Sequence, residues 1–252
     1  MNKPVKVKGG LRTNQEEQES SKLKNIFNES NTSWEIKMEN FPKFIKRQNL
    51  TRLLSLYEIF KLVVDVKGSI IECGVNQGFG LMSWAKFSSI LEPINLTRRI
   101  YGFDTFEGFP DINDKDKSEQ SKHLKKGDLK AEVFEEINKL IDVYDSTRSL
   151  GHINKVSVIK GNAIKTIPNF IKANPHLLVS LLFLDFDLYE PTKIAIENFI
   201  PRMPKGSIIA FDELDNPLWP GETLAMLEAH SKYNFELKRF NFDPYISYAI
   251  LN

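Results

Sequence analysis

The chain has 252 residues, of which 41% are hydrophobic and 11% aromatic, enough to build a substantial core in one large or two small domains. Its 34 basic and 33 acidic residues leave a formal charge of +1, so bulk charge favours neither nucleic acid nor an anionic membrane as a partner. A single cysteine, Cys73, excludes an internal disulfide framework and suits the reducing cytosol.

The amino-terminal part, residues 1–40, is predicted to be a mobile arm followed by a first helix. Its first two dozen residues are polar and charged, and they contain no apolar segment of the kind found in secretion signals. No later segment approaches the ~20 apolar residues of a membrane span. Apolar residues at mostly helical spacing in residues 41–66 predict an amphipathic helix packed on a domain. We therefore expect a soluble, cytoplasmic protein with one domain over residues 41–252.

Strand-like and helix-like segments alternate through the rest of the chain. The strand-like runs are SIIECG, RIYGFD, KVSVIKG, LLFLDFD and SIIAFDE, and a helical pattern follows each of them. Such alternation predicts an α/β fold with a doubly wound, mostly parallel sheet. The closing runs FELKRFNF and YISYAILN have no helix between them, which predicts an antiparallel pair at one edge. The charged stretch at about residues 110–128 is predicted to be a lid-like insertion.

Polar residues or glycines end each of the five predicted parallel strands. In VSLLFLDFDLYEPT a buried strand finishes in Asp185 and Asp187, and SIIAFDE finishes in Asp212 and Glu213. A helix N-cap explains any one of these acids about as well as a site does. Because ligands of open α/β sheets bind at the carboxyl ends of the strands, the whole set predicts a ligand site there.

The first two strand ends predict a small-molecule cradle. Gly74 and Gly78 in ECGVNQGFG allow a tight turn into a helix N-terminus, and Glu72 adds a fixed carboxylate. The spacing is not that of the dinucleotide fingerprint, and a glycine pair alone also fits an ordinary turn. Asp104 in YGFDTFEGFP is placed to accept hydrogen bonds from a ribose diol. Together these residues indicate an adenosine-bearing ligand without a required pyrophosphate.

This combination resembles the class I S-adenosylmethionine-dependent methyltransferases, and more narrowly the macrocin O-methyltransferase (TylF-like) family of sugar O-methyltransferases. The segments IIECGVNQGFG, YGFDTFEGFP, LDFDLYEPT and MPKGSIIAFDE carry the likeness, which spans roughly residues 68–214. The resemblance implies a seven-stranded Rossmann-like sheet, S-adenosylmethionine as methyl donor and a divalent metal, usually Mg²⁺. It also implies that the acceptor is a hydroxyl of a deoxysugar or a nucleotide-linked sugar.

The resemblance assigns the cofactor to the first three strand ends. It places the methionine end of S-adenosylmethionine beside Glu72, Gly74 and Gly78, and the ribose beside Asp104. The chain departs from the family pattern after the third strand, where GNA stands in place of a glycine soon followed by an aromatic residue. The other predicted cofactor positions are Phe106, Gly108, Asn162 and Ala163.

The resemblance assigns the metal to the last two parallel strands. Asp185, Asp212 and Glu213 match the family's metal-binding acids, although Glu213 replaces an aspartate. Such a metal would lower the pKa of a bound sugar hydroxyl and hold it in line with the methyl group. Either Asp185 or Asp187 then accepts the proton, and the sequence leaves this choice open.

Three questions stay open at this point. Tyr189 and Trp219 are candidates for stacking on the sugar, but they are equally explained as packing residues. The two aspartates of DFD also match the metal-binding DxD of nucleotide-sugar glycosyltransferases, which is an alternative hypothesis for the function. A further alternative is a methyltransferase-like domain that binds its ligand without turnover. The expected partners are a small sugar or sugar nucleotide and further copies of the chain, as a homodimer or larger homo-oligomer, with no nucleic acid and no membrane.

Overall fold

The computed structural model describes residues 14–122 and 124–252, which form two compact units. The residues up to Leu54 form one unit, and Ser55–Asn252 form the other. The division falls inside α3 (Arg47–Val63), because every buried side chain of that helix lies at or after Ser55. The domain boundary after residue 40 stays a prediction, and part of the predicted mobile arm lies outside the described residues.

The first unit contains α1 (Asn14–Glu29), α2 (Trp34–Glu39), a 3₁₀ turn at Phe41–Lys43 and the beginning of α3. Ser33 caps α2 by accepting a hydrogen bond from the N–H of Ile36 at 3.5 Å. The ring of Phe27 meets that of Phe44 edge to face, with centroids 5.0 Å apart. The predicted amphipathic helix at residues 41–66 is therefore α3 preceded by a short 3₁₀ turn.

The second unit is built on a seven-stranded sheet in the order β3-β2-β1-β4-β5-β7-β6. The first five strands along the chain are parallel, and β7 runs antiparallel to both β5 and β6. This confirms the predicted doubly wound sheet with an antiparallel carboxyl-terminal pair. The strands are β1 (Ser69–Cys73), β2 (Ile100–Asp104), β3 (Val156–Lys160), β4 (Val179–Leu184), β5 (Ile208–Phe211), β6 (Lys238–Arg239) and β7 (Ser247–Ile250).

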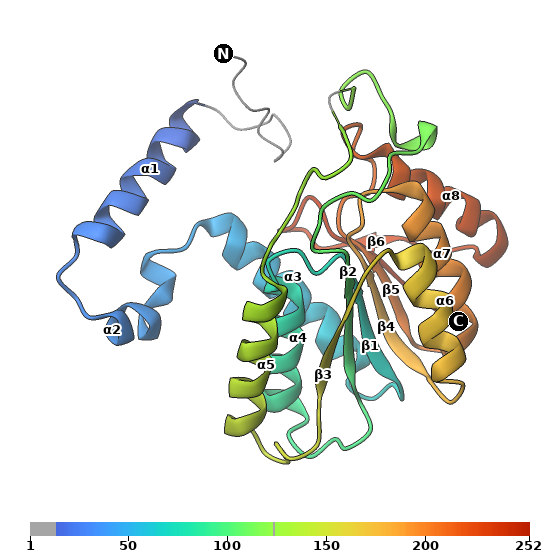
Figure 1. Cartoon of the computed structure of the whole chain (residues 1–252), viewed down its shortest axis with the longest axis horizontal. Coiled ribbons are helices and arrows are strands. Elements are labelled where there is room, and N and C mark those ends of the chain that lie inside the picture. The colour runs from blue at the N-terminus through green and yellow to red at the C-terminus, as the bar shows by residue number, and fades with distance from the viewer. Residues whose placement is uncertain (1–13, 123) are drawn as a thin grey trace. The chain divides into compact units, whose positions relative to one another are not determined.

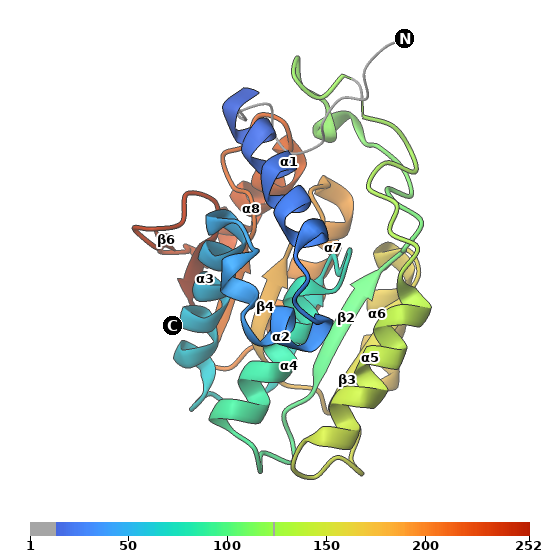
Figure 2. The same ribbon diagram turned by 90° about the vertical axis from the view of Figure 1, so that its left-hand side faces the viewer.

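Helices cover both faces of this sheet (Figures 1 and 2). One face packs against α4 (Phe79–Leu91), α5 (Phe134–Thr147) and the second half of α3. The opposite face packs against α6 (Ala163–Ala173), α7 (Tyr189–Phe199) and α8 (Pro220–Tyr233). Two short 3₁₀ turns, η2 (Asp114–Asp116) and η3 (Ile200–Arg202), complete the unit. None of the described helices is long and apolar enough to cross a bilayer.

The core runs through the central strand β4, which is buried at every position. On one face the ring of Phe183 meets Trp84 of α4, with centroids 5.7 Å apart. On the other face Phe103 of β2 meets Phe199 of α7 at 5.8 Å. A continuous apolar run suits a strand that is covered on both faces, which explains why the sequence shows no polar alternation there. The polar residues are concentrated instead at the ends of the strands.

Candidate active site

The turn between β1 and α4 fits closely against the neighbouring strand end. Gly74 has φ of 96°, and a Cβ there would overlap the backbone oxygen of Asp185. Gly78 has φ of 83° and is the N-cap residue of α4. Glu72 is buried beneath the helix, where a Cβ on Gly80 would come within 2.6 Å of its Oε1. The turn thus needs glycine for its backbone, and Gly80, which the motif did not single out, makes room for the glutamate.

Asp104 connects the first two turns of the site. Its Oδ2 accepts a hydrogen bond from the N–H of Asn76 at 2.8 Å, and its Oδ1 accepts one from the N–H of Phe106 at 2.6 Å. A carboxylate oxygen can accept a second bond, so Asp104 retains capacity for hydroxyl donors. It is also half-buried at the wall of a cleft, which is where a ribose diol would need it.

A cleft at the carboxyl end of the sheet joins the two groups of predicted residues. It is open to solvent, and its space is about 610 Å³ with the open mouth included. The predicted residues that line it are Gly74, Asp104, Gly108, Asn162, Ala163, Asp185 and Asp187. Gly161, at the predicted end of the third strand, also lines it, together with residues that the sequence did not identify: Asn76, Thr105, Phe109, Pro110, Leu129, Phe186, Leu188 and Pro191.

The remaining predicted cofactor residues shape the loops around the cleft. Phe106 is buried with φ of 57°, and its ring lies 5.3 Å from that of Phe134. Gly108 has φ of 80°, and a Cβ there would overlap the backbone oxygen of Asp128. Asn162 is the N-cap of α6 and accepts the N–H of Ile164 at 3.0 Å. Its capping role and its position in the cleft wall are therefore compatible.

The acids that follow β4 and β5 lie side by side at the same edge of the sheet. The N–H of Asp185 donates to the oxygen of Cys73 at 2.8 Å, and the N–H of Asp212 donates to the oxygen of Leu184 at 2.9 Å. Asp187 has φ of 62°, a conformation that non-glycine residues rarely adopt. Glu213 accepts a hydrogen bond from the side-chain amide of Asn216 at 2.7 Å.

Glu222 in the first turn of α8 joins this acidic group, although the sequence gave no reason to select it. Its side chain is 1% exposed, its Oε1 accepts the N–H of Glu213 at 3.4 Å, and its Oε2 makes no hydrogen bond. Burial raises the pKa of Glu222 well above its ordinary value, and the negative charges of Asp187 and Asp212 raise it further. The edge therefore concentrates negative charge in a poorly solvated place.

The acidic group suits a hard cation in its chemistry. Within residues 14–122 and 124–252, no group of three or more His, Cys, Asp or Glu side chains is arranged to hold a metal ion. Mg²⁺, however, is commonly bound by one or two carboxylates, with water and substrate oxygens completing its shell. Asp185 and Asp212, which follow neighbouring strands, offer oxygen donors of the kind such a site uses, and metal binding by Asp185, Asp212 and Glu213 stays a prediction.

The two predicted sugar contacts are both packed inside the protein. Tyr189 is 4% exposed, and its hydroxyl donates to Oε2 of Glu228 at 2.7 Å. Trp219 is also 4% exposed, and its ring meets Phe109 of the cleft wall with centroids 5.7 Å apart. Each thus has a packing role, and contact with a substrate stays a prediction for both.

Comparison with known proteins identifies the family. The family model of the macrocin O-methyltransferases (TylF) matches residues 15–234. The chain belongs to this family. It is therefore an S-adenosylmethionine-dependent methyltransferase, as the strand-end motifs predicted. The match extends on both sides of residues 68–214, the segment in which the sequence showed the likeness.

Solved structures of related methyltransferases agree with this assignment. The calicheamicin methyltransferase CalS11 is 34% identical, with a TM-score of 0.90 over 95% of this chain and 93% of its own. A structure of apo CalS11, described as a TDP-rhamnose 3'-O-methyltransferase of calicheamicin biosynthesis, is 31% identical, with a TM-score of 0.81 over 95% of each chain. The O-methyltransferase NovP, at 20% identity and a TM-score of 0.64 over 81% of this chain and 80% of its own, shows the shared fold. Among curated protein sequences there is no significant match.

Proposed function

We propose that this methyltransferase transfers a methyl group to a hydroxyl of a deoxysugar or a nucleotide-linked sugar with the help of a divalent cation. The observation that supports the proposal is that Gly74, Asp104, Asp185 and Asp187 line one cleft, so the proposed cofactor and metal residues border the same space. The description of CalS11 as a TDP-rhamnose 3'-O-methyltransferase supports a sugar nucleotide as the first acceptor to test.

The cofactor site is proposed to use the first three turns of the sheet edge. S-adenosylmethionine supplies an electrophilic methyl group when it is bound. The turn of Gly74 and Gly78, with Glu72 beneath it, takes the methionine end, and Asp104 accepts the ribose hydroxyls. Phe106, Gly108, Asn162 and Ala163 hold the surrounding loops in place.

The cation is proposed to bind at the ends of β4 and β5. Asp185 and Asp212 follow neighbouring strands, so both can offer an oxygen to one ion, and Glu213 adds a longer donor beside them. A bound Mg²⁺ supplies charge that favours the ionised form of a sugar hydroxyl. Asp187 lines the cleft two residues after Asp185, so we assign metal binding to Asp185 and acceptance of the hydroxyl proton to Asp187.

Contact with the sugar is proposed for the region of Tyr189 and Trp219. Trp219 supports the cleft wall through Phe109, and Tyr189 begins α7 directly after the lining residue Leu188.

The homo-oligomer and the cytoplasmic location also stay predictions. Membership of a methyltransferase family decides against the DxD glycosyltransferase alternative. A measurement of methyl transfer distinguishes an active enzyme from a binding domain without activity.

The test is transfer of labelled methyl from S-adenosylmethionine to TDP-rhamnose and a panel of other sugar nucleotides, with Mg²⁺ or with EDTA. Asp187→Asn keeps the size of the side chain and removes the base, so we expect methyl transfer to fall by about 10²- to 10⁴-fold. Asp215→Asn, an exposed acid on the loop after β5, is the matched control and should leave the rate unchanged. Binding of S-adenosylmethionine without methylation of any sugar or sugar nucleotide would overturn the proposal.

A further inference from the structure

The loop after β2 crosses the carboxyl end of the sheet as a strap, defined here as residues 109–122. The base of the strap is closed by two backbone bonds: the N–H of Phe109 donates to Asp128 at 3.0 Å, and the N–H of Gly127 donates to Phe109 at 2.9 Å. Figure 1 shows this segment in green above the sheet, and its turn η2 contacts α8. The lid-like insertion at about residues 110–128 stays a prediction, and its described part contacts α7 and α8.

Asp116 is the residue of the strap whose side chain is buried against α7. Its side chain is 2% exposed, although its neighbours Asp114 and Lys117 in the same turn are exposed. One carboxylate oxygen, Oδ2, accepts the N–H of Asn113 at 2.8 Å and closes the turn. The other, Oδ1, accepts the N–H of Tyr189 at 2.6 Å. Burial raises the pKa of Asp116, while these two bonds act in the opposite direction.

The bond to Tyr189 completes the N-terminus of α7. The N-cap position of this helix is Leu188, whose side chain cannot accept a hydrogen bond, and no side-chain cap is formed there. The first N–H groups of a helix need an acceptor, and a negative charge at this end is favourable. Asp116 supplies both from a different part of the chain, so it does for α7 what a local N-cap aspartate would otherwise do.

The start of α8 packs closely against the hydrogen bond between Asp116 and Tyr189. A Cβ on Gly221 would overlap Oδ1 of Asp116 and lie 2.5 Å from the N of Tyr189. The next residue is Glu222, the buried acid of the site. Two outer contacts hold the strap nearby: Nζ of Lys115 lies 2.5 Å from Glu228, and Oγ of Ser118 donates to the oxygen of Pro217 at 2.6 Å. Strap, α7 and α8 therefore meet at the carboxylate of Asp116.

The consequence concerns Asp187, two residues before Tyr189. Its φ of 62° is costly for a non-glycine residue, and such a conformation persists only where the surroundings hold it. The backbone of Asp187 is anchored on one side by β4 and on the other by the beginning of α7. We propose that Asp116 is a positioning residue for methyl transfer, which holds the turn of Asp187 at the acceptor by binding the N–H of Tyr189. This inference rests on the proposed function, in which Asp187 takes the proton.

The proposed role separates rate from cofactor binding. Gly74 and Asp104 are not bonded to the strap carboxylate, so the affinity for S-adenosylmethionine should be kept when Asp116 is changed. In Asp116→Ala we expect kcat to fall by about 100-fold, the size of effect that a misplaced catalytic group produces. Asp116→Asn keeps an oxygen for the N–H of Tyr189, so it should retain most of the lost activity.

The matched control is Asp114→Ala in the same turn. Its side chain is 95% exposed and pairs with Lys117, so its loss removes a charge from the strap without touching α7. The experiment measures kcat and KM for TDP-rhamnose, calorimetric affinity for S-adenosylhomocysteine, and amide hydrogen exchange of residues 186–190, all at a temperature where each variant is folded. The exchange measurement does not depend on turnover.

We expect faster exchange at Tyr189 and lower kcat in Asp116→Ala, unchanged cofactor affinity, and wild-type behaviour in Asp114→Ala. Unchanged exchange and kcat in Asp116→Ala would overturn the positioning role while leaving the proposed function intact. An equal loss of cofactor affinity and kcat would also overturn it, since this indicates a general structural defect. Wild-type protein that methylates no sugar would overturn the proposed function, and the catalytic part of this inference with it.

Discussion

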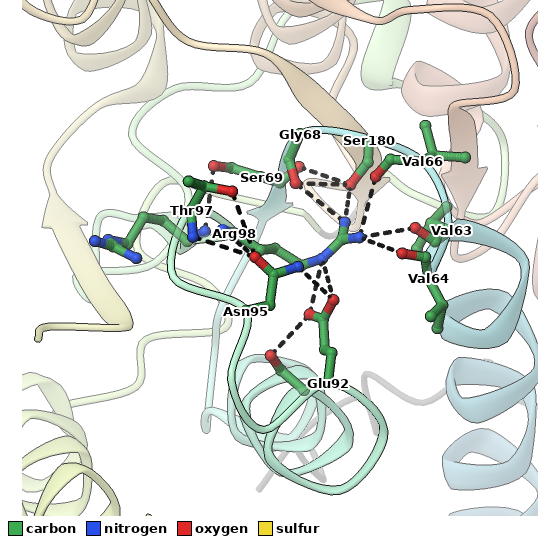
Figure 3. Close-up of polar contacts among 12 residues, drawn as sticks. Val63, Val64, Val66, Gly68, Ser69, Glu92, Asn95, Thr97, Arg98 and Ser180 are labelled. Carbon is green, nitrogen blue, oxygen red and sulfur yellow. Dashed lines mark hydrogen bonds and ion pairs between the residues drawn. The ribbon is translucent and has the colours of Figure 1, made fainter. Parts of the chain in front are cut away.

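Charged side chains are buried at both ends of the parallel strands, here called the amino edge and the carboxyl edge. The two ends differ in how the charges are compensated. At the amino edge, Arg98 and Glu92 form a close ion pair, with side chains 2% and 7% exposed (Figure 3). At the carboxyl edge, Glu222 is equally buried, and the charges of Asp187 and Asp212 have the same sign as its own. At the amino edge an ion pair neutralises the buried charge, whereas the carboxyl edge brings several acidic side chains together.

Arg98 is a structural centre. Its guanidinium donates to the oxygens of Val63, Val64 and Val66 at the end of α3 (Figure 3). Val63 is the last residue of α3, and Val64 and Val66 follow it, so the arginine caps the end of α3 and joins it to the sheet. Further bonds from Arg98 to the oxygen of Gly68 and to Oγ of Ser180 reach the beginnings of β1 and β4.

Structural and functional buried charges differ in how the surrounding groups compensate them. A buried ion pair whose donors and acceptors are all used gives no opening for a ligand. Like charges gathered at a cleft instead lower stability and are typical of functional sites, where a cation or substrate completes the arrangement. Substitutions at the two edges should therefore have opposite signatures.

The largest effect is expected for Arg98→Met. It leaves Glu92 buried without its partner and removes the donors for the end of α3, so unfolding free energy should fall by about 3–5 kcal/mol. Urea denaturation measures this change. Arg99→Met is the matched control, because the side chain of this neighbouring arginine donates to an exposed carbonyl, that of Leu96. A loss below about 1 kcal/mol in Arg98→Met would contradict the structural role of the amino edge.

A second test uses the pH dependence of stability at the amino edge. Burial lowers the pKa of Lys155 to about 8, and the positive charges of Arg148, Arg98 and Arg99 act in the same direction. The unfolded chain binds this proton more tightly, so stability should rise between about pH 8 and pH 10.5, by at most about 3 kcal/mol. Lys155→Met should remove this rise. An identical pH profile in the variant would contradict the lowered pKa.

A smaller effect is expected from a cation at the carboxyl edge. Mg²⁺ at ten times its dissociation constant should stabilise the wild-type protein by about 1.4 kcal/mol, since only the folded chain assembles the acids. Asp185→Asn should lose this increment, whereas Asp111→Asn on the exposed part of the strap should keep it. Thermal unfolding with Mg²⁺ and with EDTA measures both. Equal stabilisation of the two variants would place the cation elsewhere.

The smallest effect is expected for an isosteric substitution at the carboxyl edge, Glu222→Gln. Glu222→Gln keeps an acceptor for the N–H of Glu213 and replaces a carboxyl group whose charged form is disfavoured by burial and by Asp187 and Asp212, so unfolding free energy should change by less than about 1 kcal/mol or increase. Glu92→Gln leaves Arg98 without its anionic partner and should be clearly destabilising in the same urea assay. Comparable losses in both variants would show that the edges do not differ as described.

The fold was predictable because each strand and helix carries its own local pattern. The apolar run of β4 and the alternation of strands with helices follow from burial on both faces of the sheet. Asp104 was found because it ends β2, and Asp185 and Asp212 because they directly follow β4 and β5, so all three lie at the carboxyl edge. For these residues a local signal and the topology lead to the same place.

The residues that sequence reasoning missed depend on contacts between distant segments. Asp116 lies in a stretch of alternating charge where nothing local distinguishes it from the exposed Asp114. Glu222 resembles any acid in the first turn of a helix, and Arg98 any arginine before a strand. Their roles arise only when α7, α8 and the end of α3 are brought to them by the fold.

The most direct test of the account is calorimetric titration of S-adenosylhomocysteine into the wild-type protein and Asp104→Ala, with Asp111→Ala as the exposed control. The account predicts that the wild type and Asp111→Ala bind alike, and that Asp104→Ala binds about 100-fold more weakly, a loss of about 2.7 kcal/mol, while remaining folded. Equal binding by Asp104→Ala, or no binding by the wild type, would contradict the placement of the cofactor at the carboxyl edge of the sheet.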